Sequence, residues 1–128
     1  MKIKNYTPHE IKIYDKNQAH YVPEKRKWFI NENEKDNPIR VIPSDGILNA
    51  KIDYIETETL EGIPIYSPEV TNIDTPPENC YIVVSALYVQ AAKILGIPTK
   101  RMLTVSQPVY EDENNPRPIG CLGLNKNQ

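Results

Sequence analysis

The chain has 128 residues, a length typical of one hydrophobic core, and we expect residues 1–128 to form a single domain. Its formal net charge of -2 gives no long-range attraction to DNA, RNA or a membrane surface, and no apolar run approaches the ~20 residues of a membrane-spanning helix. No signal peptide precedes the first polar residues and two cysteines are too few for a disulfide framework, so we expect a cytoplasmic protein.

The first half of the chain predicts short strands separated by polar turns. In residues 10–14, Ile11 and Ile13 alternate with their neighbours, which gives a strand with one buried face. A charged, asparagine-rich loop is expected at 31–37. The strands predicted in this half cover residues 2–6, 10–14, 21–30, 39–42 and 47–57.

The longest apolar run, from Cys80 to Pro98, changes character at Ser85. Residues before Ser85 are β-branched and aromatic, which indicates a buried strand, whereas those after it are helix formers. Ser85 can cap the helix because its hydroxyl accepts from an amide of the first turn, and Gly96 ends it. The remaining elements predicted in this half are a strand at 63–66, a proline-rich surface connection at 67–79, and strands at 100–105 and 119–122.

The order of these elements predicts the fold class. Strands outnumber helices, and the one strong helix comes late in the chain. We therefore predict an α+β fold in which a mainly antiparallel β-sheet packs against one principal helix at about 85–95, with room for a second short helix.

The end of the helix that begins at Ser85 is the best candidate for an anion site. A strand that runs directly into a helix aims backbone amides beyond the strand end, where a phosphate is favoured. If the strand after the helix returns beside the first, Arg101 would approach Ser85 and add a guanidinium to the same site. The alternative is that Ser85 only caps the helix and Lys100-Arg101 is a solvated turn.

The sequence offers no pattern of catalytic or metal-binding groups. His9 and His20 lack the spacing of metal ligands, and together with Cys80 and Cys121 they form no local zinc motif. The acidic runs are typical of solvated surface, and the glycines of residues 120–123 lack the strand–glycine–helix context of a phosphate loop. We therefore predict a protein without enzymatic activity, metal or cofactor.

Tyrosine dominates the aromatic residues, with eight copies against one Trp and one Phe. Tyrosine is favoured at recognition surfaces because it combines area, rigidity and a hydroxyl. Tyr88 on the first helical turn, Tyr110 before the acidic loop and Trp28 after the basic run 25–27 are each able to stack on a base. The alternative for each ring is packing at the edge of the core or in an oligomer interface.

Several motifs together resemble a family of small phage proteins. Residues 5–11 (NYTPHEI) resemble its N-terminal N-L-T-P-H-x-I signature. Residues 82–87 (IVVSAL) with 90–92 (QAA), then Arg101 and residues 119–124 (IGCLGL), resemble the rest of the pattern. By these motifs, which span nearly the whole chain, the sequence resembles the first type described of the phage Thoeris anti-defence sponges.

The resemblance implies a fold, a function and a partner. Members of that family have an antiparallel sheet flanked by helices, assemble through dimers, and sequester cyclic ADP-ribose-type immune signals without cleaving them. The resemblance therefore implies a phage protein that acts in the cytoplasm of a bacterial host. Its ligand would be a glycocyclic ADP-ribose-type signal or another cyclic oligonucleotide, and it would be a homo-oligomer, either a dimer or a larger assembly such as a hexamer.

The resemblance also implies which side chains bind the ligand, because family pockets place an aromatic ring and an arginine around the adenine. Before the acidic loop, where the family pattern has an arginine, this chain has Tyr110. The helix end and the resemblance together offer five ligand-binding candidates, which are Ser85, Tyr88, Arg101, Tyr110 and Arg117. The alternative function is a phage protein–protein interaction module that binds a host protein through its tyrosine-rich surface and sheet edge.

Overall fold

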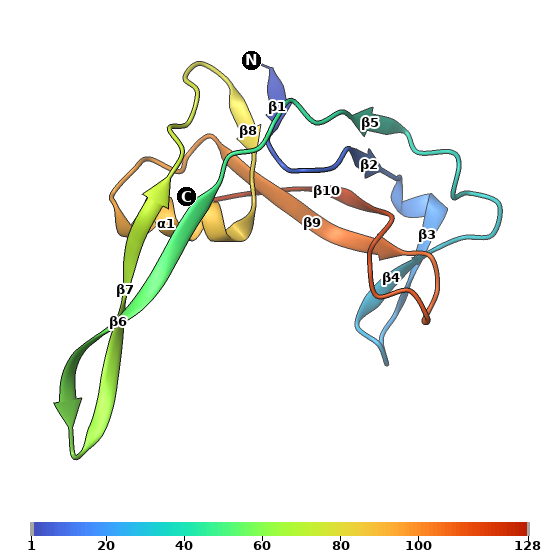
Figure 1. Ribbon diagram of the computed structural model, residues 1–128. Helices are drawn as coiled ribbons and strands as arrows, with labels where there is room; N and C mark the ends of the chain where they lie inside the picture. The colour runs from blue at the N-terminus through green and yellow to red at the C-terminus, as the bar shows by residue number, and fades with distance from the viewer. Residues whose placement is uncertain (1, 128) are drawn as a thin grey trace.

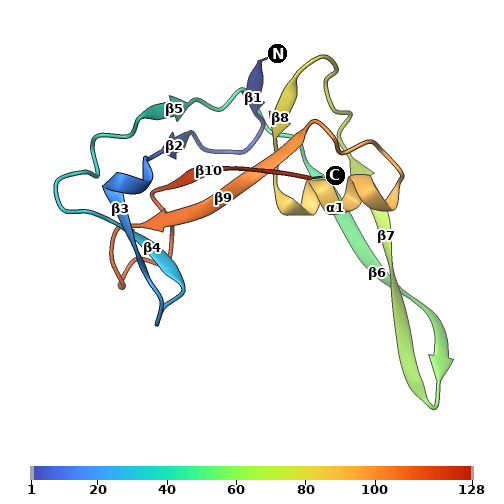
Figure 2. The same ribbon diagram turned by 180° about the vertical axis from the view of Figure 1, so that it is seen from behind.

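The computed structural model describes residues 2–127, which form two β-sheets and one α-helix (Figures 1 and 2). The helix, α1, covers Ala86–Ile94, and a short 3-10 turn, η1, covers Lys16–Gln18. The strands are β1 (Ile3–Asn5), β2 (Ile11–Ile13), β3 (Ala19–Val22), β4 (Lys27–Ile30), β5 (Arg40–Ile42), β6 (Ala50–Leu60), β7 (Ile63–Ile73), β8 (Tyr81–Val83), β9 (Met102–Tyr110) and β10 (Gly120–Lys126). The predicted α+β class is confirmed.

The larger sheet has eight strands of mixed direction. Its main path is β1-β8-β9-β10-β2-β5, and the β3–β4 hairpin joins it because β4 pairs with β9. Four of the strand pairs are parallel, namely β1–β8, β8–β9, β4–β9 and β2–β10. The other three pairs of this sheet, β9–β10, β2–β5 and β3–β4, are antiparallel, as is the β6–β7 pair of the second sheet. The prediction of a mainly antiparallel sheet is therefore only partly confirmed.

The strand β8, the helix α1 and the strand β9 form one unit whose two strands are parallel neighbours, with Ile82 opposite Met102. The predicted helix caps are confirmed. The amide of Tyr88 donates to Oγ of Ser85 over 3.2 Å, and Gly96 has a positive φ of 73° just beyond the helix.

The core lies on both faces of the central strands. On one face, Tyr88 and Val89 of α1 pack with Ile82, Val84 and Met102. Because successive side chains of a strand point to opposite faces, Val83 belongs to a second cluster on the other face. That second cluster comprises Ile11, Ile42, Val83, Leu103 and Cys121.

A second, two-stranded sheet projects from the body of the molecule (Figure 1). We call its residues 50–73 the arm. A tight turn joins its strands at Glu61 and Gly62, whose φ values of 51° and 78° are typical of a two-residue hairpin loop. At the base of the arm, the side chains of Ala50 and Ile73 pack against the core cluster beneath α1.

The arm extends further than the sequence predicts. The segment 67–79 was expected to be a surface connection because of its prolines, but β7 continues to Ile73. In a two-stranded ribbon every second amide points away from the partner strand, so Pro64 and Pro68, four residues apart, fit without breaking the ladder.

Residues 21–30, predicted as one strand, are instead divided between the strands β3 and β4 of a hairpin. The chain turns at Pro23, whose carbonyl accepts from the amide of Arg26 over 3.2 Å. Arg26 itself has a positive φ of 54°, which ends the extended backbone.

Candidate ligand pocket

A pocket of about 580 Å³ opens where β8 and β9 begin. Its volume falls in the range of roughly 300–1,000 Å³ that small-molecule sites occupy. One wall is formed by residues 75–80, which connect the arm to β8, and the other by residues of 97–102, which connect α1 to β9. Ile82 lies between the two walls.

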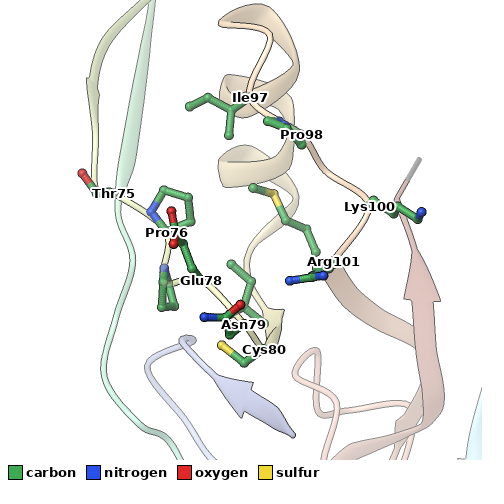
Figure 3. A pocket seen from close by; sticks show the side chains of 12 residues that line it. Thr75, Pro76, Glu78, Asn79, Cys80, Ile97, Pro98, Lys100 and Arg101 are labelled. Carbon is green, nitrogen blue, oxygen red and sulfur yellow. The ribbon is translucent and has the colours of Figure 1, made fainter. Parts of the chain in front are cut away.

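Arg101 brings a positive charge to this pocket. Its guanidinium is directed inward above Asn79 and Cys80, whereas the Lys100 ammonium points away (Figure 3). The Arg101 backbone is held in place because its carbonyl accepts from the amide of Ile82 over 2.9 Å. None of the ion pairs found among residues 2–127 involves Arg101, so its guanidinium is available to a ligand anion.

The rest of the pocket combines an apolar wall with two polar groups. Pro76, Pro77 and Ile97 are among its apolar lining residues, and proline rings are rigid. Glu78 and Asn79 add a carboxylate and an amide to the same rim. This mixture suits a ligand that carries a phosphate, a flat ring and hydrogen-bond donors.

Asn79 has an unusual backbone. Two residues before β8, it has a positive φ of 63°, a conformation that asparagine adopts more readily than most residues. Such conformations gather at ligand-binding sites, where the surrounding structure holds them in place. Here the strand pairing of β8 begins two residues later, and Asn79 lines the pocket.

Tyr88 supports the pocket wall from below. Its side chain has no exposed surface, and its hydroxyl donates to the carbonyl of Asp74 over 2.6 Å. Burial, followed by the nearby charge of Asp74, raises the pKa of Tyr88, so the hydroxyl keeps its proton and remains a donor. Asp74 immediately precedes Thr75, the first pocket residue, which makes Tyr88 a positioning residue with no ring face open for stacking.

The expected approach of Arg101 to Ser85 does not occur. The strand β9 is parallel to β8, so the helix returns the chain to the end where β8 starts, whereas Ser85 follows the end where β8 stops. Four strand positions separate the two residues along the sheet, which corresponds to about 13 Å. Ser85 therefore caps α1 and is not part of the pocket.

Tyr110 and Arg117 lie near the far end of β9, about 30 Å along the strand from Arg101. Tyr110 is half-buried and lies beneath the ammonium of Lys27, which is 4.5 Å from the ring centroid. Arg117 is exposed in a loop, where its amide donates to Oδ1 of Asn115 over 3.1 Å. Of the five candidates, the structure thus brings Arg101 alone into the pocket.

Apart from Arg101, none of the pocket-lining residues was predicted as a ligand-binding residue, and the largest missed group is the wall of residues 75–80. Residues 75–79 were interpreted as part of a surface connection, because prolines and asparagine are typical of loops, and Cys80 as the start of a buried strand. The signal that was present is the pair Pro76-Pro77 next to Asn79, a rigid segment directly before a buried strand.

The motifs that carry the family resemblance have structural roles. Asn5 is fully buried, and its Nδ2 donates to the carbonyls of His9 (2.8 Å) and Ile42 (3.3 Å). A Cβ added at Gly120 would lie 2.5 Å from the Lys12 carbonyl oxygen, so only glycine lets β10 approach β2 this closely.

Within residues 2–127, no three His, Cys, Asp or Glu side chains gather where they could hold a metal ion, and no helix is long and apolar enough to span a bilayer. Cys80 and Cys121 are both buried free thiols and belong to different core clusters. Comparisons of the chain with protein-family models, with curated proteins and with solved structures found no match.

Proposed function

We propose that this chain is a phage-encoded immune-evasion protein that binds and sequesters a cyclic nucleotide signal without cleaving it. The proposed ligand is of the glycocyclic ADP-ribose type or is another cyclic oligonucleotide. The observation that carries the proposal is the Arg101 guanidinium, which is directed into a pocket of about 580 Å³ with an apolar wall. The motif resemblance supports the same class of ligand.

The pocket chemistry matches the parts of such a ligand. A diphosphate is recognised by a guanidinium through two parallel charge-assisted hydrogen bonds, which Arg101 can supply. An adenine ring packs against apolar groups, which the rigid rings of Pro76 and Pro77 offer. Glu78 and Asn79 supply acceptors and donors for ribose hydroxyls and for the adenine amino group.

Sequestration requires tight binding and, on our proposal, more than one subunit. Nanomolar affinity corresponds to about 12 kcal/mol. Both pocket walls are surface connections of a single protomer, so a second subunit over the opening would increase the buried ligand area. We therefore propose a homo-oligomer, either a dimer or a larger assembly such as a hexamer, in the cytoplasm of the bacterial host.

Isothermal titration calorimetry with glycocyclic ADP-ribose tests the proposal. We expect Arg101→Asn to weaken binding about 10- to 100-fold, since hydrogen bonds to charged groups contribute about 1.5–3 kcal/mol. The matched control is Arg26→Asn, which removes the same charge from an exposed turn where asparagine suits the positive φ of 54°. This control is expected to bind like the original chain.

The fate of the ligand is the second readout. Ligand released by heat should chromatograph unchanged, because the proposal includes no chemical step. No heat of binding to the original chain would contradict ligand binding, and recovery of a cleaved product would contradict sequestration.

A second candidate function is a module that binds a host protein, and the exposed apolar side chains of the arm favour it. Native mass spectrometry of protein purified from cells that make the signal separates the two functions. A retained small molecule supports the sponge, whereas a stoichiometric host protein without a small molecule supports the module.

A further inference from the structure

The arm has two long strand edges that no other strand covers. Its strands β6 and β7 have eleven residues each and pair only with each other, and the ribbon projects away from the large sheet (Figure 1). The edge strands of the large sheet are shorter, with three residues in β1 and β5 and four in β3. A two-stranded ribbon is marginally stable by itself and a third strand stabilises it, so the arm is well suited to accept a strand.

Two prolines show which backbone groups of the arm point outward. Pro64 lies opposite Thr59, and Pro68 lies opposite Tyr54. Because proline has no amide hydrogen, these are pairs without mutual hydrogen bonds, whose backbone groups point away from the partner strand. Alternation along the ladder makes four residues of each strand face outward in this way. They are Ile52, Tyr54, Glu56 and Thr59 on β6, and Pro64, Tyr66, Pro68 and Val70 on β7.

The two edges of the arm therefore differ in their capacity to bind a strand. On β7, Pro64 and Pro68 are two of the four outward-facing residues, so that edge lacks every second amide donor. On β6 all four outward-facing residues have an amide hydrogen, and among residues 2–127 the backbone of β6 makes hydrogen bonds with that of β7 alone. Prolines at an edge oppose strand addition, so β6 is the open edge.

The side chains beside β6 determine what kind of strand fits there. On one face of the arm, the rings of Tyr54 and Tyr66 are 60% and 57% exposed. On the other face Asp53 lies directly opposite Glu69, and the Asp53 carboxylate accepts from the Thr71 hydroxyl over 2.9 Å. Like charges opposite each other on a sheet are destabilising. An added strand is therefore stabilised by apolar side chains on the tyrosine face and by basic side chains on the carboxylate face.

The net charge of the arm indicates that the added strand comes from another protein. Residues 50–73 hold five carboxylates and one lysine, a net charge of -4, and that lysine, Lys51, lies 3.8 Å from the Asp53 carboxylate. Two β6 edges would repel each other. The strands β1 and β2 of this chain do combine lysine with isoleucine, but they are already paired within the large sheet. A second copy of the chain therefore offers no free strand of the required chemistry.

We propose that the outer edge of β6 binds an extended segment of another protein in which basic and apolar residues alternate. The segment becomes the third strand of the arm. Backbone hydrogen bonds to the outward groups of residues 52–59 supply the affinity, and the two faces of the arm select the alternation. The inference rests on the second candidate function, whose partner chemistry it names, and it does not involve the pocket of Arg101.

Fluorescence anisotropy of a labelled eight-residue peptide in which lysine and valine alternate tests the proposal. The original chain should bind this peptide saturably below about 1 mM protein, and a peptide with glutamate in place of lysine should not bind. Tyr54→Pro removes an outward amide from β6 and should raise the dissociation constant at least about tenfold. The matched control is Tyr66→Pro, which removes a tyrosine of similar exposure and an outward amide from the β7 edge. It should raise the dissociation constant less than about threefold, and circular dichroism confirms that both variants are folded.

Backbone methylation separates strand addition from charge attraction. One further peptide has N-methyl groups on its valine amides and another has them on its lysine amides. Since successive amides of a strand point to opposite edges, only one of these peptides keeps free amides toward β6, and that one alone should bind.

Three results would overturn the inference: no binding of the unmodified peptide, equal binding of the two methylated peptides, or equal losses in Tyr54→Pro and Tyr66→Pro. Light scattering without peptide gives a fourth, because a dimer that Tyr54→Pro dissociates would assign the β6 edge to a second copy. No nucleotide is added in any of these measurements, so their failure is distinguishable from a failure of the calorimetric test of the pocket.

Discussion

The buried amide of Asn5 holds together two segments that are far apart in the sequence. Its Nδ2 group reaches the loop after β1 at His9 and the end of β5 at Ile42, and its Oδ1 accepts from the Thr7 amide over 2.9 Å. A buried side chain with this many partners leaves several backbone groups without hydrogen bonds when it is removed. The N-terminal motif is therefore explained by the stability of the fold.

We expect Asn5→Ala to lower the free energy of unfolding by about 3 kcal/mol, because each orphaned buried polar group costs about 1–3 kcal/mol. The measurement is urea-induced unfolding followed by circular dichroism. Asn72→Ala, an exposed position on β7, is the control and should change stability by less than about 0.5 kcal/mol. Equal stability of the two variants would show that the Asn5 network is not structural.

Arg101 shows where residue-level prediction fails. The sequence identified it as an anion-binding side chain, and it lies in the pocket, but its expected neighbour Ser85 lies at the other end of β8. Residue type indicates what a side chain can bind. Which residues surround it depends on the direction of strands that no local pattern determines.

Among the elements, the strand β8 and the helix α1 are those that the sequence predicts best. Their sequence signals are local: a β-branched run, a serine that caps the helix and a glycine that ends it, which has a positive φ in the structure. The parallel return of β9 and the extension of β7 to Ile73 depend instead on pairing with distant partners. The two-residue turn at Glu61-Gly62, which defines the arm, was missed because glutamate rarely has a positive φ.

Ser85 gives a test that separates capping from ligand binding. Ser85→Ala should lower the free energy of unfolding by about 1 kcal/mol, whereas Ser85→Asp should retain it, because aspartate also caps and its charge suits a helix N-terminus. The measurement is urea unfolding of the three chains, with calorimetry on each. If the affinity for glycocyclic ADP-ribose falls with Ser85→Ala but not with Arg101→Asn, the ligand binds at the N-terminal end of α1 and not in the pocket of Arg101.

At the scale of the whole molecule, three buried side chains that keep their protons make the free energy of unfolding depend on pH in the alkaline range. Burial is the largest cause that raises the pKa of the Tyr14 and Tyr88 hydroxyls above the ordinary value of 10.0. Burial likewise raises the pKa of the Cys121 thiol above 9.0. In the unfolded chain these groups lose their protons at the ordinary pKa, and in the folded chain only at higher pH.

We therefore expect stability to fall as pH rises above about 9, because the unfolded state then binds fewer protons than the folded state. These three groups should cause no change below that pH. The measurement is urea unfolding at a series of pH values up to about 10.5, and the double variant Tyr14→Phe, Tyr88→Phe should show a shallower alkaline slope. A slope identical to that of the original chain would contradict the assignment to these tyrosines.

The strand order also determines when each part of the chain can fold during synthesis. β1 pairs with β8 and β2 with β10. Ile3 therefore cannot pair with Tyr81, nor Ile13 with Cys121, until that later residue has left the ribosome. The arm, by contrast, pairs only within residues 50–73. A nascent chain can thus present a finished arm while its main sheet is still open, since contacts close in sequence form first.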